Sequence, residues 1–286
     1  MMRNHCPACD ATDSHYVFTV GGFDIKRCNH CATLFVALLL SEEELNAIYQ
    51  SDDYYELPRE SVERIEAENH RRITVLRTLV ADGRFLDIGC ARGDLLDEAA
   101  RVGYETYGIE PSMRNAEIAS AKGHRVFSGS LVEFLRMHGG MTFDVVTCLD
   151  VIEHIPAPLD FIRQAASVLA ARGWLAVSTP NYSGIVAKVL KQSDPYMTPP
   201  EHLNFFTAQG LEILAARAGL EIGRKTNFGR LTNAEMRRSL QRYIPGALAP
   251  FYPFIAQVVK VAFVSANRAG LGLEQEVYLR KVQAPK

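Results

Sequence analysis

Short apolar strands alternate with helices from residue 84 to about residue 183, and this alternation strongly constrains the fold. The five candidate strands are RFLDIG, YETYGIE, HRVFSG, FDVVTCLD and GWLAVSTP. The helices expected between them are DLLDEAARVG, SMRNAEIASAKG, SLVEFLRMHG and PLDFIRQAASVLAARG. Strands separated by helices form βαβ units, so we predict an α/β fold with a parallel sheet. One more helix and strand follow over 207–225, and a last strand over 274–282.

The turn after the first strand, within FLDIGCARGDLL (85–96), has the composition of a ligand-binding turn. The strand ends in Asp87, and Gly89 and Gly93 permit a tight turn and a close approach of the backbone to a ligand. The second strand ends about 20 residues later in Glu110, whose carboxylate suits a ribose diol. A dinucleotide or S-adenosylmethionine would fit such a site, but the G-x-G-x-x-G pattern of pyrophosphate binding is missing.

FLDIGCARGDLL resembles motif I of class I S-adenosylmethionine-dependent methyltransferases, and FDVVTCLDVIEHI and RGWLAVSTPN resemble the family's fourth- and fifth-strand motifs. The resemblance covers roughly residues 84–225 and the final strand, and it implies a Rossmann-like, mostly parallel sheet whose last strand is antiparallel. It also implies a cofactor site. The residues at the matching positions are Asp87, Gly89, Cys90, Ala91 and Gly93 for the methionine part, Glu110 for the ribose, Pro111, Ser130 and Leu131 for the adenine, and Leu149 and Asp150 beside the cofactor.

Ala91 departs from the family pattern, because a glycine is usual at this middle position of the turn. Alanine adds a methyl group and disfavours a positive φ angle, so the turn must tolerate both. The departure weakens the expectation of cofactor binding slightly without overturning it.

The N-terminal segment contains two CxxC pairs, Cys6 with Cys9 and Cys28 with Cys31, separated by 18 residues. The start of the chain has no apolar signal-peptide core, so we expect a cytoplasmic protein. In that compartment, cysteine pairs with this spacing are more often metal ligands than disulfide partners. Two such pairs predict a tetrahedral Cys₄ zinc site with a structural role. CPAC and CNHC also resemble the zinc ribbons that precede some sugar and natural-product methyltransferase domains. Four reduced cysteines without metal remain the alternative.

The stretch CLDVIEHIPAP (148–158) places three polar side chains after the fourth strand, where the transferred methyl group is expected. A helical turn there would put Asp150 on one face with Glu153 and His154. His202, in PPEHLNFFT, is a fourth candidate. This pattern resembles the metal site of terminal ribose methyltransferases of small RNAs and the E-H element of ubiquinone-biosynthesis O-methyltransferases, although Asp150 replaces a glutamate.

Three interpretations of these four residues stay open. His154 and His202 act as a base or orient the acceptor, with Asp150 and Glu153 beside them. Alternatively, the four side chains bind Mg²⁺ or another divalent ion. In the third interpretation the carboxylates cap a helix and the histidines are hydrogen-bonding loop residues. We favour structural roles for Asn181 and Tyr182 after the fifth strand and for Tyr54 and Tyr55. The alternatives are contact with the acceptor or cofactor for the first pair and closure over the pocket for the second.

Five segments follow from these patterns. They are a zinc ribbon (1–40), a helical linker or cap opened by a capping box at Ser41 and Glu44 (41–82), the Rossmann-like core (83–229), an apolar helical insertion (230–270) and the final strand (271–286). The insertion is interrupted by Pro245, Pro250, Pro253 and Lys260, so we expect no transmembrane segment. We interpret it as buried or capping, with a membrane-surface contact or a homodimer contact through 244–264 as the alternative.

These features together predict a methyltransferase that uses S-adenosylmethionine. We expect an oxygen acceptor on a small or medium hydroxylated molecule such as a sugar, a nucleotide sugar or a natural-product precursor, and a lipid- or carrier-linked acceptor stays open. The formal net charge of −2 argues against nucleic acid, because phosphate contact usually needs a basic surface. An RNA methyltransferase that uses the ribbon to hold RNA and an inactive cofactor-binding scaffold are the alternatives.

Overall fold

The strands form one large sheet in the computed structural model, which describes residues 2–39, 44, 59–229 and 251–282. Its strands are β4 (Arg84–Ile88), β5 (Glu105–Glu110), β6 (Arg125–Ser128), β7 (Phe143–Leu149), β8 (Leu169–Pro180), β10 (Leu220–Phe228) and β11 (Glu274–Lys281). They lie in the order β10-β11-β8-β7-β4-β5-β6. Strands β4 to β8 pair in parallel, and β11 runs antiparallel between β8 and β10. The predicted α/β fold and antiparallel last strand are confirmed.

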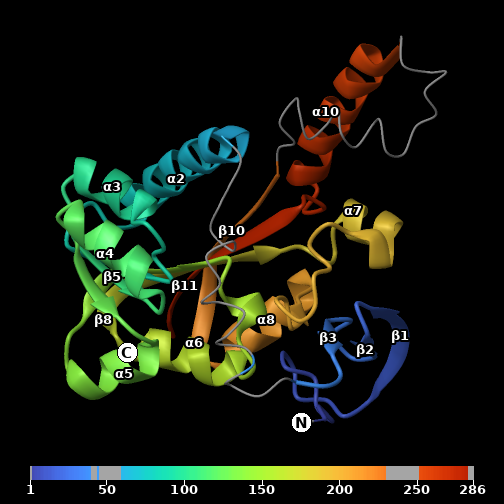
Figure 1. The fold of residues 1–286 in the computed structure, drawn as a ribbon, viewed down its shortest axis with the longest axis horizontal. Coiled ribbons are helices and arrows are strands. Elements are labelled where there is room, and N and C mark those ends of the chain that lie inside the picture. The colour runs from blue at the N-terminus through green and yellow to red at the C-terminus, as the bar shows by residue number, and fades with distance from the viewer. Residues whose placement is uncertain (1, 40–43, 45–58, 230–250, 283–286) are drawn as a thin grey trace.

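Helices cover both faces of this sheet (Figure 1). They are α2 (Arg59–Leu79), α3 (Asp94–Arg101), α4 (Met113–Ala121), α5 (Leu131–Met137), α6 (Pro158–Ser167), α7 (Ile185–Leu190), α8 (Ala208–Arg217) and α10 (Tyr252–Arg268), with short 3₁₀ turns η2 (Ile152–His154) and η3 (Lys191–Ser193). Neighbouring residues of a strand point to opposite faces. Accordingly Phe85 packs in one core with residues of α2, α3 and α4, and Leu86 packs in another with residues of α5, α6 and α8.

The sequence-based boundary between α6 and β8 is wrong. The helix was expected to run to Gly173, but it ends at Ser167, and β8 already begins at Leu169. Leu169 pairs with Phe143, whereas the next paired residue is Trp174, opposite Val145. A bulge therefore absorbs the intervening residues, and apolar periodicity alone does not reveal it.

The N-terminal segment forms a second sheet that includes a piece of the core. Its strands are β1 (Ser14–Val20), β2 (Phe23–Cys28), β3 (Leu34–Val36) and β9 (Asn204–Phe205), in the order β1-β2-β3-β9. The side chains of Thr207 and Arg217 add hydrogen bonds to the carbonyl oxygens of Cys31 (2.6 Å) and Ala8 (2.9 Å). The ribbon is thus joined to the segment that follows His202.

Helix α10 projects away from the sheet in Figure 1. Its described side chains do not form a buried core, since Phe254 is 72% exposed and Val261 is 59% exposed. The expectation of burial is wrong for this part, and a capping or contact role stays a prediction. The described residues include no helix with the length and apolar character needed to cross a membrane. The predictions on Ser41, Tyr54, Tyr55 and residues 230–250 lie outside the described residues.

Candidate active site

The turn after β4 adopts the conformation expected of a ligand-binding turn. Gly89 and Gly93 have φ angles of 80° and 79°. A Cβ atom at Gly89 would stand 2.7 Å from Cγ2 of Val151, so a side chain does not fit there. Ala91 also takes a positive φ, 45°, at a cost of roughly 1–2 kcal/mol. Alanine thus occupies the left-handed conformation that a glycine would adopt more easily.

Glu110 ties this turn to the end of β5. The Ala91 N–H donates to Oε2 of Glu110 at 2.9 Å, and the Ser112 N–H donates to Oε1 at 2.8 Å. The side chain is buried, with an exposed fraction of 2%. A carboxylate offers about four acceptor positions, so these bonds are compatible with further hydrogen bonds from a ribose diol. The bond to Glu110 also compensates part of the strain at Ala91.

Asp87 lies beneath the turn rather than on its surface. Thr147 of β7 donates from Oγ1 to Oδ1 of Asp87 at 2.6 Å. Burial raises the pKa of this carboxyl to about 7, while the bond from Thr147 and the nearby charge of Arg72 act in the opposite direction. Cys90 is also buried, and burial raises the pKa of its thiol. Both residues therefore support the turn from within.

The other predicted cofactor residues lie at the carboxyl ends of β5, β6 and β7. Pro111 is exposed just after β5. Ser130 forms a capping box with Glu133 at the start of α5, and Leu131 packs into the core. Leu149 ends β7 and is partly buried. The parallel strands bring these residues to one sheet edge, where class I folds of this kind bind ligands.

Asp150 is half exposed and contacts a buried ion-pair network that sequence reasoning missed. Its Oδ1 accepts a hydrogen bond from Ser178 Oγ at 2.8 Å, and its Oδ2 lies 3.7 Å from Nη2 of Arg72 on α2. The Nε of Arg72 donates to Glu276 of β11 at 2.9 Å. Asn69 and Arg72 share the helical spacing of the apolar Ile73 and Leu76, and this pattern was the available sequence signal.

The structure brings three of the four predicted catalytic residues together. Ligand atoms of Glu153, His154 and His202 lie within 4.8 Å of one another. The two imidazole rings meet edge to face, with centroids 4.6 Å apart. Asp150 is outside this group. It has a positive φ of 56° and precedes the 3₁₀ turn η2, so the expected helical turn starting at Asp150 is wrong.

Hydrogen bonds to the backbone orient both histidines. Nδ1 of His154 lies 2.8 Å from the Glu201 carbonyl oxygen, and Nδ1 of His202 lies 2.8 Å from the Tyr196 carbonyl oxygen. Carbonyl oxygens only accept, so each Nδ1 carries the proton, and Nε2 is the acceptor nitrogen of each ring. Burial lowers the pKa of His154, and burial with the neighbouring His154 lowers that of His202 to about 3. Both rings are neutral at physiological pH.

Glu153 is buried and has an unusual environment for a carboxylate. It is 1% exposed, and its Oε2 atom has no hydrogen-bond partner in the described part of the chain. Burial, with a contribution from the charge of Asp150, raises the pKa of this carboxyl well above its ordinary value. Such an orphaned oxygen beside two imidazoles has the chemistry of a ligand for a divalent cation.

The four N-terminal cysteines converge as the spacing predicts. Sγ of Cys6 lies 3.5 Å from Sγ of Cys31, and Sγ of Cys9 lies 3.5 Å from Sγ of Cys28. Tetrahedral zinc with bonds of about 2.3 Å would separate its sulfur ligands by about 3.8 Å. All four sulfur atoms are within 4.8 Å of one another, so the cluster is compatible with one zinc ion.

The loop that carries His202 depends on the ribbon. The Val36 N–H donates to the Leu203 carbonyl oxygen at 3.0 Å, and Leu203 N–H donates to the Glu153 carbonyl oxygen at 2.8 Å. The amide of Asn204 donates to the Ile155 carbonyl oxygen at 2.8 Å. The cysteine cluster and the Glu153–His154–His202 group are therefore connected by short backbone segments.

Known proteins share the sequence pattern of the core. A family model described as "Methyltransferase domain" matches residues 56–224. The ubiquinone biosynthesis O-methyltransferase of Albidiferax ferrireducens is 34% identical over 110 residues, covering 36% of this chain and 44% of that protein. The protein of the same name from Burkholderia orbicola is 30% identical over 157 residues, covering 47% of this chain and 67% of that protein. The first of these relatives is thus matched over less than half of its length.

Solved structures share the fold, at sequence identities that support the fold alone. The CcbJ methyltransferase from Streptomyces caelestis has a TM-score of 0.56 and 14% identity, covering 85% of this chain and 100% of that chain. Magnesium protoporphyrin IX methyltransferase from Synechocystis PCC 6803, with bound SAH, has a TM-score of 0.55 and 15% identity over 85% of this chain and 100% of that chain.

Because the family model covers more than half of the sequence, the chain belongs to the methyltransferase-domain family and is a class I S-adenosylmethionine-dependent methyltransferase.

Proposed function

We propose that this enzyme methylates a hydroxyl oxygen of a small or medium hydroxylated acceptor, such as a sugar, a nucleotide sugar or a natural-product precursor. The observation that carries the proposal is the His154–His202 pair at the carboxyl edge of the sheet, where each ring keeps Nε2 as its acceptor nitrogen. Two relatives are named O-methyltransferases, which supports oxygen as the methylated atom. A lipid-linked acceptor fits the same chemistry.

The proposed cofactor site lies along the turn after β4. Glu110 accepts hydrogen bonds from the ribose, while Gly89, Ala91 and Gly93 line the methionine part with backbone atoms. Asp150 stands beside the cofactor, and Arg72 is a positioning residue, because its guanidinium lies 3.7 Å from Oδ2 of Asp150. The remaining residues of the motif, Asp87 and Cys90, support the turn from below.

Methyl transfer to a hydroxyl requires an aligned acceptor and a destination for the hydroxyl proton. The acceptor oxygen must approach the methyl carbon to about 3–3.5 Å in line with the carbon–sulfur bond. A base works best when its pKa is near the working pH. We assign the base to His154, because the pKa of His202, about 3, makes that ring a weak proton acceptor. His202 then orients the acceptor through Nε2.

The test measures release of S-adenosylhomocysteine with a panel of sugars, nucleotide sugars and catechols. The double variant His154→Ala/His202→Ala should lose about 100-fold or more in turnover, because positioned general bases contribute 10²–10⁴. His70→Ala, at an exposed histidine, is the matched control and should keep wild-type turnover. Wild-type turnover in the double variant would show that neither histidine takes part in catalysis and that both only form hydrogen bonds within their loops.

A divalent cation at Glu153, His154 and His202 is a second candidate, supported by the grouping of their ligand atoms and by the orphaned Oε2 of Glu153. Two imidazoles and one carboxylate suit a transition metal such as Mn²⁺, Fe²⁺ or Zn²⁺ better than Mg²⁺. When bound, such an ion supplies Lewis acidity toward the acceptor oxygens. Loss of turnover in EDTA and recovery with added Mn²⁺ but not Mg²⁺ would favour this candidate.

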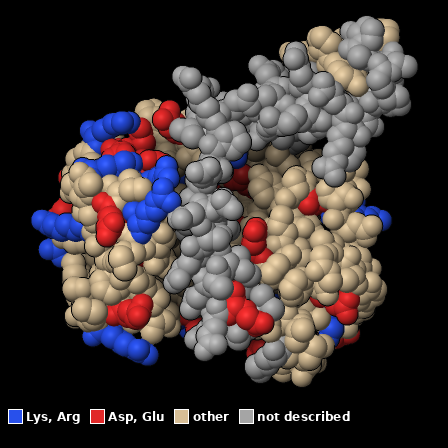
Figure 2. All heavy atoms as spheres, in the orientation of Figure 1, with Lys and Arg blue, Asp and Glu red and all other residues tan. Residues whose placement is uncertain are grey.

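The two alternatives to a small-molecule enzyme make different predictions. On the face shown in Figure 2, the described Lys and Arg side chains are interspersed with Asp and Glu, so this face offers no continuous basic track for RNA. A salt-dependent RNA mobility shift would support an RNA acceptor. A scaffold without catalysis would bind S-adenosylmethionine but release no S-adenosylhomocysteine with any acceptor.

A further inference from the structure

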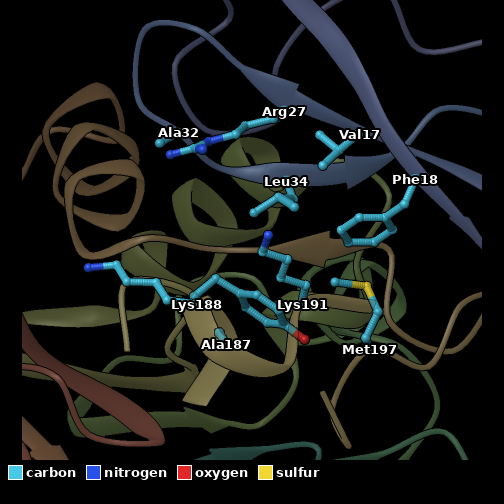
Figure 3. Close-up of a pocket in the computed structure, with 10 residues that line it drawn as sticks. Val17, Phe18, Arg27, Ala32, Leu34, Ala187, Lys188, Lys191 and Met197 are labelled. Carbon is cyan, nitrogen blue, oxygen red and sulfur yellow. The ribbon is translucent and has the colours of Figure 1, made fainter. Parts of the chain in front are cut away.

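A cavity of about 280 Å³ lies between the ribbon and the segment that contains α7 and η3. Its ribbon wall includes Val17, Phe18 and Leu34, and its core wall includes Ala187 and Met197 (Figure 3). Phe18, Leu34, Ala187 and Met197 belong to the apolar cluster that joins the ribbon to the core. The volume is slightly below the usual range for small-molecule sites, about 300–1,000 Å³; such sites are mostly apolar with a few placed polar groups.

Three cations also line this mostly apolar cavity. They are Arg27 of β2, Lys188 of α7 and Lys191 of η3. Figure 3 shows their nitrogen atoms toward one side of the cavity, whereas Phe18, Val17 and Met197 lie toward the other side. Within residues 2–39, 44, 59–229 and 251–282, none of these three cations has an acidic partner. An amphipathic cavity with positive charge at one end is complementary to an anion attached to an apolar chain.

Lys191 also adopts an uncommon backbone conformation, with a φ angle of 49° and a ψ angle of −115°. Such a conformation costs of the order of 1–3 kcal/mol and persists only where the surroundings impose it. It turns the chain directly after α7, at the second of the two lysines that line the cavity. The strained backbone is therefore located at one of the three cationic residues, at the junction of α7 and η3.

The cavity adjoins the loop that positions His202. Met197 lines the cavity, and the preceding residue, Tyr196, accepts the hydrogen bond from Nδ1 of His202 at 2.8 Å. Tyr182 also lines the cavity, and its ring packs against Phe205 of β9 with centroids 5.0 Å apart. A ligand in the cavity therefore contacts the same loop that carries one of the two histidines of the candidate active site.

We propose that this cavity binds an amphipathic anion, a phosphate or carboxylate carried on an alkyl or prenyl chain. The anionic group pairs with Arg27, Lys188 and Lys191, and the chain lies against Phe18, Leu34 and Met197. Binding is independent of methyl transfer. The ligand could also be the anionic end of the molecule that is methylated, and only this further step rests on the proposed function.

Isothermal titration of the 286-residue protein, in buffer with added zinc, with octyl phosphate tests the proposal. We expect one site per chain, with affinity at least about tenfold higher than for butyl phosphate, because each further buried methylene adds to binding. Arg27→Met/Lys191→Met should weaken octyl phosphate binding about tenfold or more, since two ion pairs are lost. Arg172→Met removes an exposed charge elsewhere and should change the affinity less than about twofold.

A second variant, Ala187→Phe, fills the cavity from α7 and should abolish octyl phosphate binding while S-adenosylmethionine binding, measured in parallel, stays unchanged. Unsaturable binding of octyl phosphate, or equal affinity in wild type, the double variant and Ala187→Phe, would overturn the proposal. Failure of methyl transfer with intact octyl phosphate binding would instead count against the proposed function alone.

Inhibition kinetics distinguish the two sources of such a ligand. If the ligand is the anionic end of the acceptor, octyl phosphate should compete with the acceptor that turns over. If it is a separate lipid acid, inhibition or activation should not be overcome by raising the acceptor concentration. Either pattern supports an amphipathic-anion site, provided that it disappears in Ala187→Phe.

Discussion

Arg72 is buried at the edge of the candidate cofactor site, and its replacement by methionine should destabilise the fold. The side chain is 6% exposed and lies 2.9 Å from Glu276, 3.7 Å from Asp150 and 3.9 Å from Glu274. Removing one partner of a buried ion pair typically costs about 3–5 kcal/mol, because the other charge stays buried. Glu276 keeps its bond to Arg71 at 3.1 Å, so we expect a loss near the lower limit, about 3 kcal/mol.

This loss corresponds to a decrease in Tm on the order of 10 °C for a chain of this size. Thermal unfolding at pH 7.5, in buffer with added zinc and followed by circular dichroism, measures it. Arg71→Met is the matched control: Arg71 contacts the same carboxylate but is 33% exposed, so about 1 kcal/mol or less should be lost.

A double-mutant cycle with Glu276→Gln should give a coupling of at least about 1 kcal/mol with Arg72. Affinity for S-adenosylmethionine should also decrease in Arg72→Met, because Asp150 loses its cation. A Tm within about 2 °C of wild type, or equal losses in the Arg71 and Arg72 variants, would refute the reasoning.

Three further predictions follow from the site. As the pH falls, the decrease in kcat/KM that follows protonation of the site histidines should be centred below pH 6.5, because burial lowers the pKa of His154 and His202 and keeps their neutral, proton-accepting form below the ordinary value; a decrease centred at or above pH 6.5 that persists in His154→Gln would be assigned to another group, and one centred there that disappears in this variant would contradict the reasoning. Metal analysis should find about one zinc per chain. Cys6→Ser should lower the zinc content, and it should also lower turnover because the loop that carries His202 is less well held. A Cys6→Ser protein that folds and works normally without zinc would contradict a structural zinc site. Glu110→Ala should weaken S-adenosylmethionine binding at least about tenfold by calorimetry, and unchanged affinity would remove Glu110 from the site.

Local patterns were sufficient to predict most elements of the core. Strand β7 spans residues 143–149 and was expected over 143–150, because the run FDVVTCLD is apolar and is followed by polar residues. Gly89 and Gly93 were recognised because only a tight turn requires glycine at such positions. The boundary of β8 was mistaken because the bulge before Trp174 depends on pairing with Phe143 and Val145 of β7.

The candidate active site was predicted only in part. Glu153, His154 and His202 were expected together and lie together, but Asp150 turns toward Ser178 and Arg72 instead. Those partners are 28 and 78 residues away from Asp150 in the sequence, and no local pattern couples them. Contacts between such distant residues follow from the packing of α2 and β8 against the site.

The sequence alone determined the family, the parallel sheet, the glycine turn and the cysteine spacing, because each of these depends on residues that are close together in the chain. Tertiary structure decided the features that distant segments create. These are the pairing of β3 with β9, the burial of Arg72 against Glu276 and the cationic cavity between the ribbon and α7. The physical reason is that burial and charge pairing are set by which segments pack together, and local periodicity does not encode that choice.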